Sequence, residues 1–369
     1  MLRGMGNGVR RGVKRVDAER YLLWMLLSFA GSVVLTRVYL QLTGFPQLGS
    51  GDLHIAHLLW GGLLLFIGAL LMLTLANRWV FRLSAILSGV GVGLFIDEVG
   101  KFITKTNDYF YPAAAPIIYS FFLLTVLLYF QVRRHNARDA RSELYQVFEY
   151  LTEVIDEDMD EVERAAIESR LQRVVGRDIY PDQVKLASVL LDFIRSSDLH
   201  VVQHPVNRLE RWLLQLQKFE AKWINRRLAR GVIVVGLIAF GALAAIDLGP
   251  IVRAIFSPDF ATQLNSAIVS AGLVKSANGL LWYIARQTLE GIVGVMLLTS
   301  AGLLATRREQ VGLTLGYFGL LLYLLTVNFL ILYFDQFTTI LATVAQFGLL
   351  LAMMRYRHRY LTASLPTHR

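Results

Sequence analysis

The chain has 369 residues, of which 55% are hydrophobic and 18% are charged. This composition is typical of a membrane protein rather than a water-soluble one. The formal net charge of +9 suits arginine-rich loops on one side of a membrane, and no basic segment is interleaved with a nucleic-acid-binding motif. Because the sequence contains no cysteine, disulfides, thiolate catalysis and cysteine-ligated metals are excluded.

The chain begins with a basic tail, residues 1–19, that resembles the start of a secretory signal sequence. The apolar run after this tail is too long for a cleaved signal and lacks a small-x-small cleavage site. We therefore expect a signal anchor that stays in the protein.

Eight segments are apolar and long enough to cross a bilayer about 30 Å thick, which takes about 20 helical residues each. They are residues 20–43, 53–76, 79–103, 112–132, 230–250, 279–305, 309–334 and 336–354. The sequence therefore predicts an all-α fold, a polytopic transmembrane helical bundle with one half at residues 20–132 and the other at residues 230–354. Gly89, Gly91 and Gly93 alternate within the third span and are expected to permit close helix contact rather than to bind a nucleotide.

Arginine residues cluster at alternate ends of these spans, on the same side as the basic tail. The clusters are Arg78 with Arg82, Arg133 with Arg134, Arg226 to Arg230, Arg307 with Arg308, and Arg355 to Arg359. Positive charge marks the cytoplasmic side of membrane proteins. Eight spans thus predict a cell-membrane protein with both termini in the cytoplasm, including a basic C-terminal tail at residues 355–369.

Residues 133–229 are polar enough to form a small helical cytoplasmic domain between the two halves. Their apolar residues recur at helical spacing, at Leu144, Val147, Phe148 and Leu151, and again at Leu186, Val189, Leu190 and Phe193. Pro181 suits the first turn of a later helix. A charge-balanced bundle of this kind is typical of an interaction or regulatory element, so we expect a protein partner here.

The acidic run from Asp156 to Asp160 invites comparison with an EF-hand calcium loop. An EF-hand needs a glycine and a bidentate glutamate where this sequence has Glu161 and Ile167. A helix start, whose carboxylates are favoured by the helix dipole, explains the run better.

The two halves can be aligned as an internal repeat. In this alignment residues 60–78 correspond to residues 289–307, and Gly62 corresponds to Gly291. Each half would then hold four spans in the same orientation, which predicts two parallel four-helix repeats about an axis normal to the membrane. Apolar helices align easily with one another, so unrelated halves are the alternative.

A first polar group is expected on the outer side of the membrane. His54 and His57 lie one turn apart at the start of the second span, and Asp97, Glu98 and Lys101 lie at the end of the third. Because these two spans run in opposite directions, we expect His57 within contact or one-water distance of Asp97 or Glu98. Ionisable groups in a membrane cost about 2.5–3.5 kcal/mol each, so they usually have partners or a task.

Three interpretations of this group stay open. His54, His57, Asp97 and Glu98 could hold a divalent metal such as zinc. A histidine–carboxylate pair could instead exchange protons near neutral pH. The histidines could also lie in the headgroup layer without a function, which is the favoured interpretation for His54 alone.

Arg286 and Glu290 form a second polar group, inside the sixth span. If that helix enters the membrane near Gly279, Glu290 lies ~16 Å deep, close to the bilayer midplane. The two residues are one turn apart, so they either pair to fix helix packing or bind a substrate or ion. Under the repeat alignment His57 corresponds to Arg286, so both groups would face a shared centre.

Other polar residues of the spans have ordinary explanations. Arg37 and Asp335 lie near outer helix ends, and Arg37 is expected to reach the surface as an anchor. Asn328 and Gln346 are expected to form interhelical hydrogen bonds.

These features favour a transporter or ion-coupled permease in contact with the lipid bilayer. Its substrate- or ion-binding residues would be His57, Asp97, Glu98, Lys101, Arg286 and Glu290. One alternative is a membrane-embedded enzyme, metal-dependent or not, that acts on a lipid-linked or extracytoplasmic substrate. Another is a scaffold or sensor that signals through the cytoplasmic helical domain. The sequence shows no serine-nucleophile motif, phosphate loop or dinucleotide fingerprint.

Overall fold

The structure is a computed structural model of the chain. It describes residues 12–44, 57–106, 108, 111–134, 139–176, 181–196, 201–202, 225–246, 248–270, 277–335 and 339–362. These residues are helical almost throughout and contain no β-strand, which confirms the all-α class. The chain divides into two compact units. Unit 1 comprises Met1–Glu98 and Phe121–Leu213, and unit 2 comprises Val99–Ser120 and Leu214–Arg369.

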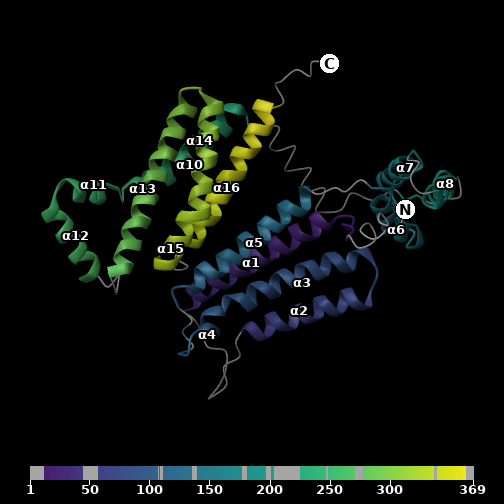
Figure 1. The fold of residues 1–369 in the computed structure, drawn as a ribbon, viewed down its shortest axis with the longest axis horizontal. Helices are drawn as coiled ribbons and strands as arrows, with labels where there is room; N and C mark the ends of the chain where they lie inside the picture. Colours follow the sequence, from purple (N-terminus) through teal and green to yellow (C-terminus); the bar gives the residue numbers. More distant parts are fainter. Residues whose placement is uncertain are drawn as a thin grey trace, which may run out of the picture. The chain divides into compact units, whose positions relative to one another are not determined.

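Three long apolar helices of unit 1 lie side by side (Figure 1). They are α1 (Ala18–Thr43), α2 (His57–Thr74) and α3 (Arg78–Asp97), and α3 contacts both of the others. Gly61 of α2 and Gly91 of α3 face each other so closely that a Cβ atom on either one would lie 2.8 Å from the other's carbonyl oxygen. The predicted role of the glycines of the third span in close helix contact is therefore confirmed.

The predicted third span, residues 79–103, is interrupted after Asp97. Glu98 is the C-cap of α3, with φ −92° and ψ 8°, and α4 (Val99–Ile103) follows in unit 2. The Asp97 carbonyl accepts a hydrogen bond from Arg37 Nη2 at 3.0 Å, which satisfies one of the carbonyls that a helix end leaves without an intrahelical partner. The next helix, α5 (Ala114–Arg134), begins in unit 2 and continues into unit 1.

Where the structure describes it, the polar segment between the halves contains α6 (Ala140–Ile155), α7 (Glu161–Val175) and α8 (Pro181–Arg195), which pack together (Figure 1). We call them the helical bundle. Its apolar core consists of Leu144, Val147, Met159, Ile167, Leu171, Val174, Ala187, Leu191 and Ile194. The bundle therefore has a core of its own, as the apolar spacing predicts.

Two helix starts of the bundle agree with the sequence. Pro181 opens α8, as expected from its suitability for the first helical position. Asp160 caps α7, because its side chain accepts from the Glu163 N–H at 2.7 Å while the Glu163 carboxylate accepts from the Asp160 N–H at 3.4 Å. The acidic run is therefore a capped helix start rather than a calcium loop.

The helical spacing at Leu186, Val189, Leu190 and Phe193 is confirmed by α8, but these residues do not form the centre of its buried face. Leu186, Val189 and Phe193 are exposed, whereas the core takes the neighbouring face that carries Leu191 and Ile194. Both faces have helical spacing, so spacing alone does not identify the one that packs against α7.

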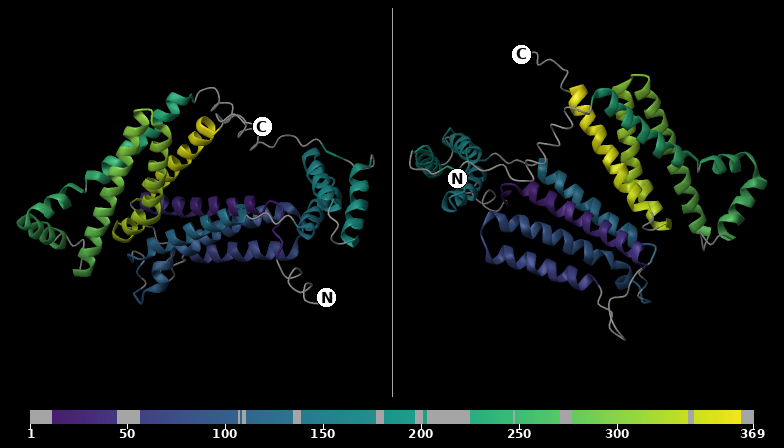
Figure 2. Two further views of the ribbon diagram at one scale, coloured as in Figure 1. Left: turned by 45° about the horizontal axis from the view of Figure 1, so that its top comes forward. Right: turned by 180° about the vertical axis from the view of Figure 1, so that it is seen from behind.

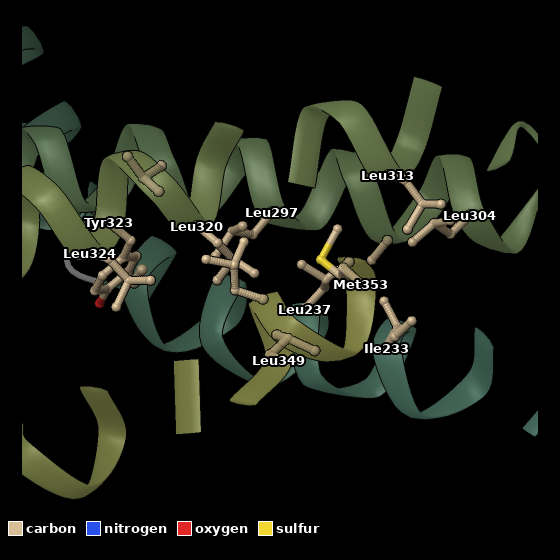
Figure 3. Close-up of a cluster of buried hydrophobic side chains, with 14 of the residues drawn as sticks. Ile233, Leu237, Leu297, Leu304, Leu313, Leu320, Tyr323, Leu324, Leu349 and Met353 are labelled. Atoms are coloured by element: carbon tan, nitrogen blue, oxygen red, sulfur yellow. The ribbon is translucent and has the colours of Figure 1, made fainter. Parts of the chain in front are cut away.

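Unit 2 is built around four helices that run alongside one another (Figure 2). They are α10 (Arg226–Ile246), α13 (Ala277–Ala305), α14 (Glu309–Leu322) and α16 (Ile340–Arg357). Figure 3 shows the leucines and Met353 that fill the space between them. Besides α4 and the start of α5, the described residues of the unit include α11 (Leu248–Phe256), α12 (Pro258–Ser270), the π-helix η1 (Tyr323–Val327), α15 (Asn328–Asp335) and the π-helix η3 (His358–Thr362). Helix α12 has a proline, Pro258, at its first position, as α8 has.

Seven helical segments of the described residues are long and apolar enough to cross a membrane. They are Ala18–Thr43, His57–Thr74, Arg78–Asp97, Ala114–Arg133, Arg226–Phe256, Gly279–Ala305 and Glu309–Asp335. The eighth predicted span, residues 336–354, is not among them. Within this region residues 340–354 lie in α16, which contains the polar residues Thr343 and Gln346 and has Arg355 and Arg357 in its last turn. The span count of eight, the parallel repeats and the orientation of the termini stay predictions.

Candidate functional site

His57 lies between two buried carboxylates in unit 1. Its Nε2 atom is 3.1 Å from Asp97 Oδ2, and its Nδ1 atom is 3.0 Å from Glu98 Oε1. The Asp97 and Glu98 side chains are 0% and 1% exposed, whereas the His57 side chain is 23% exposed. The sequence predicts contact with one of the two carboxylates, and the structure shows contact with both.

Arg37 of α1 completes this group, which we call the His57 cluster and define as Arg37, His57, Asp97 and Glu98. The Arg37 Nε atom donates to Asp97 Oδ1 at 2.5 Å, whereas His57 faces the other carboxylate oxygen, Oδ2. The Arg37 side chain is only 3% exposed, so its predicted role as a surface anchor is wrong. The sequence does contain a signal for this pair, because Arg37 lies in the first span near the end that is predicted to share a side with Asp97.

Two helix ends act on these carboxylates in opposite directions. The C-terminal end of α3 carries partial negative charge, which disfavours an anion at Asp97, and the Arg37 guanidinium offsets it. The first turn of α2, where His57 lies, carries partial positive charge and favours the two anions beside it. The cluster is therefore stabilised by residues of three helices and not by one local motif.

The geometry constrains the protons that the His57 cluster holds. A neutral imidazole has a single N–H, so it donates to only one of two flanking carboxylates. Contact at both ring nitrogens therefore requires either a doubly protonated, cationic His57 or a proton on one carboxyl group. With His57 protonated, two cations balance two anions in a buried site.

The remaining predicted members of this group are not placed with it. His54 lies outside the described residues. Lys101 lies in α4, in the other unit, and its part in the site stays a prediction. Within the described part of the chain, no group of three or more histidine and carboxylate residues is arranged to hold a metal ion. Asp97 and Glu98 face different ring nitrogens of His57, so they do not converge with one nitrogen on a common point.

Unit 2 contains a second buried polar group, which we call the Arg286 cluster and define as Arg286, Glu290, Tyr323 and Asp335. Arg286 Nε is 3.6 Å from Glu290 Oε2, so the predicted pair is present, but Arg286 Nη2 lies closer to Asp335 Oδ2, at 2.8 Å. Tyr323 donates its hydroxyl to Glu290 Oε1 at 2.8 Å. Tyr323 opens the π-helix η1, an irregularity that is frequent at functional sites. Asp335 ends α15, which confirms its expected place near a helix end, but the sequence reveals neither its contact with Arg286 nor the part of Tyr323.

Hydrogen bonds join the helices of unit 2 beside this cluster. Asn328 donates to Gln346 Oε1 at 2.7 Å, which confirms the predicted interhelical hydrogen bond. Tyr119 donates its hydroxyl to the Leu324 carbonyl in η1 at 2.6 Å. These bonds satisfy polar groups that the apolar surroundings would otherwise leave without partners.

A third polar group ties the helical bundle to the spans of unit 1. Arg78, at the first position of α3, contacts Glu153 and Glu163 of the bundle at 2.8 and 2.7 Å, and Asp17 at the start of α1 at 2.7 Å. Burial is the largest influence on the Glu153 carboxyl and raises its pKa, against the opposing effect of Arg78. Helix α3 therefore contacts the bundle at one end and carries Asp97 of the His57 cluster at the other.

Comparison with protein-family models, with curated proteins and with solved structures gives no match to this chain. Its class therefore rests on the helices themselves. The described residues include seven apolar helices long enough to cross a bilayer, which make it a multi-pass integral membrane protein.

Proposed function

We propose that the protein is a proton-coupled transporter and that the His57 cluster is its proton-binding site. The observation that carries the proposal is the His57 ring, whose two nitrogens face the buried carboxylates of Asp97 and Glu98. Histidine is the side chain that changes charge near neutral pH. The ring is partly exposed while the carboxylates are not, so protons reach the cluster through His57.

Loss of one proton changes the balance of charge in this site. Removing it takes one positive charge away from the surroundings of two buried anions, and burying an anion with less compensation is costly. A helix arrangement in which Glu98 is hydrated then gains in relative stability. Proton binding thereby shifts the population of two arrangements, as coupled transport requires.

The Arg286 cluster supplies candidate substrate-binding residues. Arg286 presents a planar guanidinium, which is suited to carboxylate or phosphate groups. We therefore propose that Arg286 and Glu290, with Lys101, contact an anionic or zwitterionic solute.

Charge displacement after a pH jump tests the proton site without knowledge of the solute. The purified protein is reconstituted into liposomes on an electrode, and the pH is stepped from about 8 to about 5, the range in which histidine titrates. We expect a protein-dependent charge displacement that falls to the level of empty liposomes in His57→Gln. The matched control is His358→Gln, which alters an exposed histidine outside the cluster.

Two results would contradict the proposal. One is a charge displacement in His57→Gln equal to that of the parent protein. The other is a panel of chemically distinct solutes, none of which enters proteoliposomes in response to an imposed proton gradient.

A proton sensor is the second candidate function, and the contacts of Arg78 with the helical bundle favour it. Helix α3 carries Asp97 at one end and Arg78 at the other. A displacement of α3 caused by a change of charge beside Asp97 would therefore move Arg78 relative to Glu153 and Glu163. A sensor would show proton-dependent hydrogen exchange in α6–α8 that His57→Gln abolishes, with no solute flux.

A further inference from the structure

We propose that the headgroup of an anionic phospholipid binds in a pocket of unit 2 that is lined by arginines. The pocket has a volume of about 520 Å³, and we call it the arginine pocket. Its lining includes Arg226, Arg227, Arg230, Arg307, Glu309 and Gln310. The proposal does not depend on the proton-coupled function, because none of these residues belongs to the His57 or Arg286 cluster.

Glu309 organises the inner wall of the arginine pocket. Its side chain is 10% exposed, and its two oxygens lie 2.8 Å from Arg226 Nη2 and 3.3 Å from Arg230 Nη1. Tyr356 donates its hydroxyl to the same carboxylate at 2.9 Å. These contacts hold two guanidinium groups at fixed positions before any ligand arrives, which lowers the entropic cost of binding.

The charge of the pocket is unbalanced. Four arginines against one glutamate leave an excess of three positive charges in the lining. Within the described part of the chain, neither Arg227 nor Arg307 makes an ion pair. Guanidinium groups bind phosphate oxygens through paired N–H donors, so a phosphate group fits this lining.

The position of the pocket favours a lipid over a soluble anion. Arg226 and Arg230 lie in the first turns of the span Arg226–Phe256, and Glu309 opens the span Glu309–Asp335. Arg307 follows directly after the end of a third span. The pocket therefore lies where three apolar helices reach the membrane boundary, the level of lipid headgroups, and basic pockets at that level bind anionic lipids.

Lipid binding to the purified full-length protein in detergent tests the proposal. Native mass spectrometry measures the affinity for phosphatidylglycerol, for phosphatidylcholine with the same acyl chains, and for inorganic phosphate. We expect phosphatidylglycerol to bind more tightly than the other two. In Arg227→Gln combined with Arg307→Gln its affinity should fall on the order of thirtyfold, since each arginine near the surface contributes roughly a fivefold factor.

The double variant leaves the contacts of Glu309 with Arg226, Arg230 and Tyr356 intact, so its thermal unfolding without lipid should match that of the parent. Arg253→Gln is the matched control, because it removes an exposed arginine of unit 2 that does not line the pocket, and it should bind phosphatidylglycerol as the parent does.

Three outcomes would overturn the proposal. Equal affinity for phosphatidylglycerol and phosphatidylcholine would show that the net negative charge of the lipid is not recognised. Displacement of the lipid by an equal concentration of inorganic phosphate would assign the pocket to a soluble anion. Undiminished lipid binding by a folded double variant would place the lipid elsewhere on the protein.

Discussion

Buried charges in this protein lie in groups whose members compensate one another. Asp97 is held between Arg37 and His57, and Glu290 between Arg286 and Tyr323. Removing one member of such a group leaves another charge buried without its counter-ion, which costs about 3–5 kcal/mol. The cost of a substitution therefore depends on which partner is left behind and on how exposed that partner is.

The Arg286 cluster gives a direct test of this dependence. Arg286→Met should destabilise the protein by about 3–5 kcal/mol, because it removes the guanidinium beside Glu290, whose side chain is 9% exposed. Adding Glu290→Gln should restore most of that loss. Adding Asp335→Asn instead should restore little, because Asp335 is 38% exposed and retains part of its hydration. Thermal unfolding in detergent measures the order of the three variants.

Glu290→Gln alone should be milder than Arg286→Met, because Asp335 still holds Arg286 at 2.8 Å. The spacing of Arg286 and Glu290 in the sequence alone suggests similar losses for the two variants, since each residue would then be the counter-ion of the other. Equal losses for the two single variants would mean that Asp335 does not compensate Arg286.

Helix packing in unit 1 depends on the close approach of α2 and α3. A Cβ atom on Gly61 would lie 2.8 Å from both the Gly91 carbonyl oxygen and the Phe95 nitrogen, and neither backbone atom can move aside independently. The next glycine, Gly62, has nothing within 4 Å of the same position. Two adjacent glycines of one helix therefore have opposite expected responses to the same substitution.

Gly61→Ala should destabilise the protein by about 1–3 kcal/mol through overpacking. Gly62→Ala should be neutral or stabilising by about 0.4–1 kcal/mol, because alanine restricts the unfolded chain without a clash. Thermal unfolding in detergent checks both.

Since α2 carries His57 one turn before Gly61, Gly61→Ala should also reduce the charge displacement after a pH jump, whereas Gly62→Ala should not. Similar unfolding of the two variants would contradict the observed crossing of α2 and α3.

The topology of the whole molecule depends on α16. Its 18 residues measure ~27 Å, close to the thickness of a bilayer core, and its arginines cluster at the C-terminal end. If α16 crosses the membrane, the chain has eight spans and both termini lie on one side. If it does not, the termini lie on opposite sides.

Reporter fusions decide between these arrangements. Fusions after Arg134 and Arg307 should read cytoplasmic, and fusions near Gly51 and Asp108 should read extracytoplasmic, because arginine marks the cytoplasmic side. A fusion at Arg369 should also read cytoplasmic if α16 is the eighth span. An extracytoplasmic reading at Arg369 alone would reduce the count to seven, whereas a reversed reading at Asp108 would mean that the early spans are miscounted.

The amino-acid sequence by itself determines where the helices of this protein lie and which of their residues are polar. Long apolar runs predict eight spans, seven of which coincide with apolar helices of the described residues, and local signals at Asp160 and Pro181 predict helix starts, because each depends only on neighbouring residues. The sequence also predicts that His57 meets a carboxylate at the end of α3, since two consecutive spans joined by a short turn bring those ends together.

Only the tertiary structure decides the partners of the buried groups. It assigns Arg37 to Asp97, Asp335 to Arg286, and Leu191 rather than Leu186 to the core of the helical bundle. Each of these choices depends on how far a helix is rotated about its axis. A transmembrane helix is apolar on all sides, and α8 of the bundle carries apolar residues on two neighbouring faces, so in neither case does the hydrophobic pattern specify that rotation. Packing against helices distant in the sequence does, through contacts such as that of Gly61 with Gly91.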